Sequence, residues 1–129
     1  MTAPTTVLRW DVPWTTPPIS LNDWDHYRVR ARKVKEVRDA AKILAMAAHL
    51  PRNLPHVTVQ LVYQPRDKRR RDADNLVGTL KALCDGLIDY GIVPDDVPEY
   101  MTKHMPRIAP PVKGETGRIW LELEWETTP

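Results

Sequence analysis

The sequence predicts a mixed α/β (α+β) fold, in which two main helices pack on a small mixed sheet in the order β-α-β-α-β-β. Apolar and polar side chains alternate over residues 56–64 and 118–126, a pattern typical of strands with one buried face. Apolar residues recur at helical spacing over residues 33–49 and 73–90. A chain of 129 residues is long enough for one hydrophobic core, so we expect one domain that spans residues 1–129.

The first third of the chain is predicted to hold a strand at residues 7–12, a loop and the first helix. The prolines after the strand favour an extended loop through residues 19–22. Five apolar residues recur at helical spacing in this helix, and Pro51 ends the pattern. These five are Val34, Val37, Ala41, Leu44 and Ala48.

The second helix is predicted to end at Gly91, because glycine readily adopts the left-handed conformation that often follows a helix. A basic connection at residues 65–71 precedes this helix, and an acidic turn at residues 94–98 follows it. Residues 100–108 are a weaker strand candidate. We expect them to form a terminal hairpin with the last strand, across a loop at residues 110–117.

The positive charge is concentrated in short runs, although the net charge of the whole chain is only +2. Five cations lie between residues 66 and 71, opposed there only by Asp67, and a second basic run covers residues 28–35. Such patches fit an anionic partner such as DNA, although a solubilising surface is the alternative. The DNA-binding candidates are Arg66, Lys68, Arg69, Arg70 and Arg71.

Several classes of protein are excluded or disfavoured. Cys84 is the only cysteine, which excludes an intramolecular disulfide and a cysteine-based zinc site. There is no glycine-rich phosphate loop, which argues against a nucleotide-hydrolysing enzyme. No apolar run approaches eighteen residues and no basic leader precedes one, so we expect a soluble, cytoplasmic protein with no membrane partner.

Acidic residues follow the basic run directly. Asp72 and Asp74 supply carboxylates and Asn75 an amide oxygen, and such hard oxygen ligands suit Mg²⁺. A further pair, Asp95 and Asp96, lies in the turn after the helix, which can fold back toward the first pair. Cations recruit a polyanion and carboxylates bind the metal, so the pattern is typical of a metal-dependent enzyme that cleaves phosphodiesters.

The second helix has an apolar face and a charged face. At 100° per residue, Lys81 and Asp85 each lie within about 20° of Asp74, and Gly78 leaves a gap that lets a backbone approach. The opposite, buried face is predicted to comprise Leu76, Val77, Leu80, Leu83, Cys84, Leu87 and Ile88.

The acids also have a purely structural explanation. Asp72 would cap the helix, Asp74 would interact favourably with the helix dipole, and Lys81 would pair with Asp85 at the surface. The neighbouring cations favour the chemical explanation, because phosphates would arrive where the acids lie.

Residues 69–76, Arg-Arg-Arg-Asp-Ala-Asp-Asn-Leu, resemble the RusA family of Holliday-junction resolvases, as do residues 81–87 and the later acidic pair. These are small endonucleases, often encoded by phages or prophages. The proline-rich loop at residues 17–22, which ends in Asn22, is similar to the loop of that family.

The resemblance implies a Mg²⁺-dependent homodimer that nicks two opposed strands of a four-way (Holliday) DNA junction, in recombination and repair. It implies that Asp72, Asp74 and Asp96 hold the metal, with Asp95 as the alternative to Asp96. It also implies that Lys81 is the catalytic lysine.

The spacing of the lysine departs from the best-known member of the family, where it follows the second aspartate by four residues. Here Gly78 occupies that place and Lys81 follows by seven. Three residues are nearly one helical turn, so we expect the lysine on the same face, about 4.5 Å farther along the axis. Asn75, Asp85 and Asn22 are candidates for supporting roles.

Two other functions fit the sequence. One is a non-catalytic nucleic-acid-binding protein of the same fold. The other is an interaction module whose basic loop binds an acidic protein.

Overall fold

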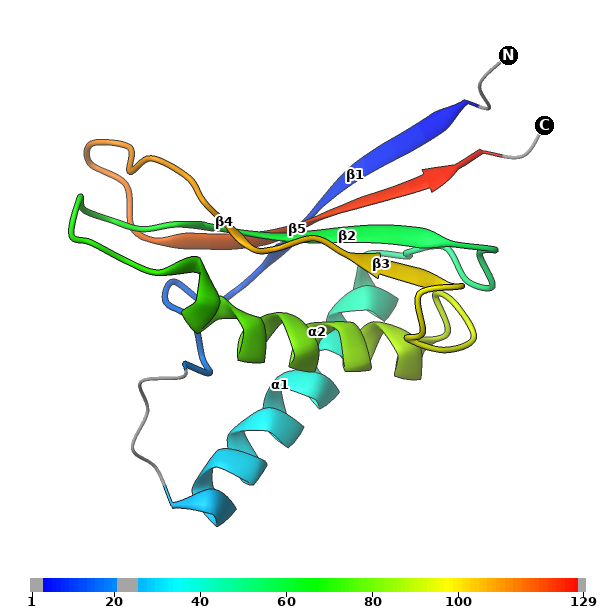
Figure 1. Cartoon of the computed structure of the whole chain (residues 1–129), viewed down its shortest axis with the longest axis horizontal. Helices are drawn as coiled ribbons and strands as arrows, with labels where there is room; N and C mark the ends of the chain where they lie inside the picture. Colours follow the sequence, from blue (N-terminus) through cyan, green and yellow to red (C-terminus); the bar gives the residue numbers. More distant parts are fainter. Residues whose placement is uncertain (1–3, 21–25, 128–129) are drawn as a thin grey trace.

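The computed structural model describes residues 4–20 and 26–127 and confirms the predicted fold class. A five-stranded mixed sheet carries two helices, both on the same face (Figure 1). The helix α2 (Val77–Tyr90) lies directly below the sheet, and α1 (Tyr27–Ala47) crosses behind α2, with its first turns farthest from the sheet and its last turns nearer to it. The first and last strands run side by side to one end of the molecule.

The longest strand, β5 (Arg118–Glu126), lies between β1 (Thr5–Val12) and β2 (Val57–Gln64) and pairs antiparallel with both. The other edge of β2 pairs in parallel with two short strands, β3 (Met101–Lys103) and β4 (Arg107–Ile108). The strand order is therefore β1-β5-β2-β3, with β4 also beside β2.

The predicted terminal hairpin is wrong, because β4 and β5 lie on opposite edges of β2. The candidate strand at residues 100–108 is also split in two. Residues 104–106 interrupt it, and Pro106 has no N–H to donate to β2. The ladder continues on either side, where the amide of His104 donates to Val59 O and that of Ala109 donates to Tyr63 O.

The first helix begins six residues before the predicted start and ends at Ala47, not at residue 49. Its N-terminus is capped by His26, whose Nδ1 accepts a hydrogen bond from the Arg28 amide at 3.2 Å. The first turns are largely exposed, so no apolar periodicity marks them. The second helix opens with a 3₁₀ turn, η1 (Ala73–Leu76), and ends as predicted at Gly91, whose φ is +99°.

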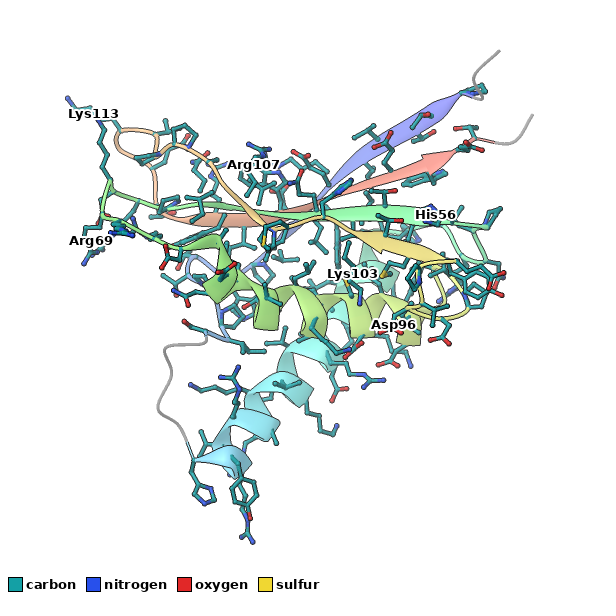
Figure 2. The ribbon with its side chains drawn as sticks, viewed as in Figure 1. His56, Arg69, Asp96, Lys103, Arg107 and Lys113 are labelled. Carbon is teal, nitrogen blue, oxygen red and sulfur yellow. The ribbon has the colours of Figure 1, made fainter. Side chains whose placement is uncertain are left out.

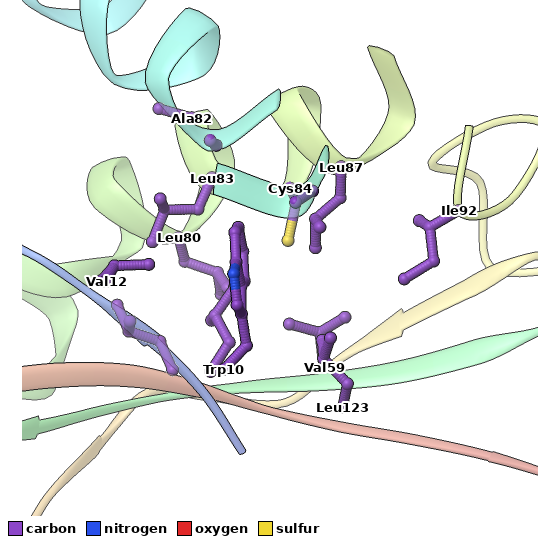
Figure 3. Packing of buried hydrophobic residues seen from close by; sticks show 14 of the residues in the cluster. Trp10, Val12, Val59, Leu80, Ala82, Leu83, Cys84, Leu87, Ile92 and Leu123 are labelled. Carbon is purple, nitrogen blue, oxygen red and sulfur yellow. The ribbon is translucent and has the colours of Figure 1, made fainter. Parts of the chain in front are cut away.

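The core lies between the sheet and α2. Trp10 of β1 reaches toward α2 and is surrounded by residues of the sheet and of that helix (Figure 3). The predicted leucine face of α2 is confirmed, because Leu80, Leu83 and Leu87 are all buried. Val77 was wrongly predicted to belong to it and is 42% exposed.

The two helices lie very close together at Gly86. A Cβ on this residue would lie 2.5 Å from Ala41 Cβ and 2.5 Å from Arg38 O of α1. Only glycine allows this distance between the helices.

Gly86→Ala should therefore lower the free energy of unfolding by about 1–3 kcal/mol, the usual cost of overpacking, although alanine favours a helix. Urea denaturation of both proteins measures this difference. Gly78→Ala is the comparison and should cost less, because its added Cβ would meet the nearest atom, Ile19 Cγ2, at 3.0 Å and would meet no backbone atom among its nearest neighbours. Equal stability of wild type and Gly86→Ala would contradict the close packing.

Candidate functional site

The connection from β2 to η1, residues 65–71, is called the arginine loop below; it carries the five predicted DNA-binding cations. Asp67 lies at its centre and holds the arginines around it. Its carboxylate accepts from Arg69 Nε at 3.1 Å and Nη2 at 2.9 Å, and from Arg71 Nη2 at 2.8 Å. These hydrogen bonds hold the pKa of Asp67 far below its usual range, and those from Arg69 contribute more than that from Arg71.

The predicted acids follow directly. Asp72 precedes η1 and Asp74 lies within it, and both side chains are exposed. Within the described residues, neither carboxylate takes part in a hydrogen bond or an ion pair. The structural explanation for Asp72 is therefore wrong, because the residue occupies the cap position without making the cap hydrogen bond.

A cavity of about 390 Å³, called the acid cavity below, lies between Asp72 and the arginines. Arg70 and Arg71 line it together with Asp72 and Asn75, and Tyr63 contributes an aromatic ring. Asp74 is not part of this lining. Positive groups and one carboxylate thus face the same hollow, as the adjacent sequence positions predicted.

The proline-rich segment forms part of the wall of the acid cavity, through Pro17 and Ser20. It is fixed by Ile19, whose amide donates to Thr79 Oγ1 at 3.2 Å, while the same hydroxyl donates to Ile19 O at 2.7 Å. The side chain of Ile19, not a backbone, fills the gap at Gly78. Asn22 lies outside the described residues.

Four charged side chains gather at a second place, on α2 and the segments after it. Lys81 Nζ lies 3.3 Å from Asp85 Oδ1 and 3.5 Å from Asp96 Oδ2. Lys103 Nζ of β3 lies 3.6 Å from the same Asp96 oxygen. We call these four residues the lysine cluster. Asp95 faces its neighbour, because its Oδ1 accepts the Asp96 amide at 2.7 Å.

The charges of the lysine cluster stabilise one another. Burial acts to lower the pKa of Lys81, but the hydrogen bond and charge of Asp85, followed by the charge of Asp96, outweigh it and raise that pKa. The charge of Lys103, followed by that of Lys81, lowers the pKa of Asp96. These contacts therefore favour the charged forms of Lys81 and Asp96.

The structure does not assemble the predicted group of three aspartates. In the described part of the chain, no three His, Cys, Asp or Glu side chains are gathered as metal ligands, so Asp96 does not join Asp72 and Asp74. In Figure 2, Asp96 and Lys103 lie well away from Arg69. Lys81 pairs with Asp85, as the structural alternative predicted.

Sequence reasoning missed two residues of these charged groups. Lys103 belongs to a short strand with little pattern, and its partner Asp96 is seven positions earlier across a turn. Asp67 was noted only as an interruption of the basic run. Its position among four arginines could have indicated that it pairs with them.

No family model and no curated protein matched the chain. The resemblance to RusA resolvases therefore stays a prediction.

No helix in the described ranges has the length and apolar character needed to cross a membrane.

The contacts of the lysine cluster predict how the pKa of Lys81 changes when its partners are mutated. Asp85→Asn should lower the pKa of the Lys81 amine, and Asp96→Asn should lower it by less, because Asp85 makes the larger contribution. An NMR titration of the lysine amines measures both shifts. Asp39→Asn, which removes the partner of Lys35, is the control and should leave Lys81 unchanged. An unchanged pKa in both cluster variants would show that these contacts do not form in solution.

Proposed function

We propose that this protein is a Mg²⁺-dependent DNA endonuclease that cuts branched DNA and that its substrate is the four-way junction. One observation supports this most directly. In the acid cavity, the carboxylate of Asp72, which has no partner among the described residues, lies with Arg70 and Arg71, so a phosphate and a metal ion would have ligands at one place. The family resemblance of residues 69–76 points to the same chemistry.

Asp72, which lines the cavity, and Asp74, two residues farther along the chain in η1, fit Mg²⁺. This ion commonly uses one or two carboxylates, keeps several waters and completes its coordination with substrate phosphate. Asp72 and Asp74 are exposed and have no partner in the described structure that a metal would have to displace. Asp96 fits less well, because a metal there would compete with two lysines.

The cationic side chains bind phosphate, and the carboxylates bind the metal. Arg70 is exposed and has no ion pair with a described residue, so its guanidinium is free to bind a backbone phosphate. Asp72 and Asp74 hold the metal, which when bound activates water and offsets charge on the phosphate. Lys81 contacts a neighbouring phosphate, with Asp85 and Asp96 fixing its amine.

The proposal includes a homodimer. One chain offers one acid cavity, whereas resolution of a four-way junction needs two symmetric incisions. A two-fold dimer supplies two sites with the symmetry of that substrate.

The test is metal-dependent nicking of a labelled four-way junction by Asp72→Asn and Asp74→Asn. Each change keeps the size of the side chain and removes a metal ligand. Nicking should fall by more than the roughly 10- to 100-fold loss that accompanies removal of a ligand's supporting contact. Junction binding should stay equal or become tighter, because a negative charge is lost.

Asp39→Asn on α1 is the control and should nick at the wild-type rate. Wild-type nicking by the Asp72 and Asp74 variants would refute the catalytic assignment. Binding of the junction without any nicking by the wild-type protein would favour the non-catalytic nucleic-acid-binding protein. Preference for an acidic polypeptide over DNA would favour the interaction module.

A further inference from the structure

A second cavity, of about 360 Å³, opens on the other side of Arg71 and Tyr63, which line both cavities. Its polar lining comes from three parts of the chain that are distant in sequence. No carboxylate belongs to this lining in the described structure. The charged and hydroxyl-bearing residues are Arg66, Arg69, Arg71, Thr15, Thr16 and Thr116.

We call this the threonine–arginine cavity. Its arginines are held in place by Asp67, which does not itself line the cavity. Asp67 binds Arg69 and Arg71 by the contacts given above, and Arg66 Nε lies 3.7 Å from Asp67 Oδ2. Arg71 Nη1 also donates to the carbonyl oxygens of Asp67 at 2.9 Å and Arg69 at 2.7 Å. One carboxylate thus orients three guanidinium groups, and two positive charges remain in excess.

Three threonines also line the cavity. The threonines come from the turn after β1 and from the loop before β5, and that loop and the arginine loop lie at the same end of the sheet. Gln64 Nε2 donates to Glu115 Oε2 at 3.0 Å and ties the loop before β5 to the end of β2. Guanidinium groups and threonine hydroxyl groups can both donate hydrogen bonds to the oxygens of a phosphate, and residues of both kinds line this cavity.

We propose that the threonine–arginine cavity is a preformed site for one phosphate of a nucleic-acid backbone, and that Asp67 is its positioning residue. The proposal deepens the function proposed above. Because Arg71 lines both cavities, the phosphate bound here lies beside the phosphate at Asp72. The site fixes the strand beside the acids and reads no base.

The sign of one mutational effect separates positioning from simple attraction. If the arginine loop acts only through its net charge, removal of the Asp67 charge increases the attraction and tightens DNA binding. If Asp67 positions the arginines, Asp67→Asn removes the contacts that orient their guanidinium groups. Binding then weakens, because mobile side chains must be ordered when the phosphate binds.

The experiment measures binding of the full chain to a labelled duplex by fluorescence anisotropy, in EDTA, at fixed low salt. Asp67→Asn should weaken binding roughly tenfold, the loss expected when a charge-assisted contact is misplaced. Asp89→Asn is the matched control, because Asp89 holds the Arg38 fork at 2.6 and 2.8 Å at the other end of α2. It should bind DNA as the wild type does.

Thr116→Val supplies a second variant, which keeps the shape and the charge. It should weaken duplex binding without changing its dependence on salt, because one hydroxyl contact is lost and no ion pair. Circular dichroism melting confirms that each variant is folded. Unchanged or tighter binding by Asp67→Asn, or unchanged binding by Thr116→Val, would overturn the proposal.

Inorganic phosphate separates the two sources of the ligand. It should compete with the duplex only weakly, whereas binding as tight as that of the duplex would overturn the assignment to a nucleic acid. Because the assay contains no metal, the two proposals fail separately. Absence of Mg²⁺-dependent nicking would refute the endonuclease alone, and wild-type duplex binding by Asp67→Asn would refute the phosphate site alone.

Discussion

At Gly86 the backbones of α1 and α2 come so close that a methyl group does not fit between them. This contact holds α2 between α1 and the sheet, so eight of its fourteen residues are buried. Only a narrow strip of the helix, which includes Lys81, reaches the surface. The helix also presents its first turn, η1, at the edge of the sheet where β2 ends. The arginine loop is the short connection between these two fixed points, and its place follows from them.

The charged groups around α2 differ in how far they satisfy one another. In the lysine cluster, two lysines and two carboxylates are paired, and a ligand must compete with those pairs. At η1, Asp72 and Asp74 have no partner in the described structure, and Arg70 beside them has none either. Unpaired charges of both signs at one cavity favour binding of a metal with a phosphate. The paired cluster favours a supporting role for Asp96.

The parts of the fold that were predicted from the sequence are those whose burial leaves a local pattern. The alternation in β2 and β5 and the leucines of α2 are examples, because one face of each packs on the core. The neighbours of β2 are set by contacts between distant residues, which explains the wrong hairpin. In the site, the adjacency of Asp72 to the arginines is local and was predicted. The pairing of Asp96 with Lys103 depends on how a turn folds back, and no local pattern encodes that.

The central claim is that Asp72 and Asp74, and not Asp96, hold the divalent ion. Paramagnetic Mn²⁺, which accepts the same oxygen ligands as Mg²⁺, broadens the NMR signals of nearby amides and so locates the ion directly. At low Mn²⁺ concentration, the amides of Asp72, Asp74 and Asn75 should lose intensity first, while those of Asp95 and Asp96 keep theirs. Broadening centred on Asp96, or broadening with no preferred place, would contradict the account.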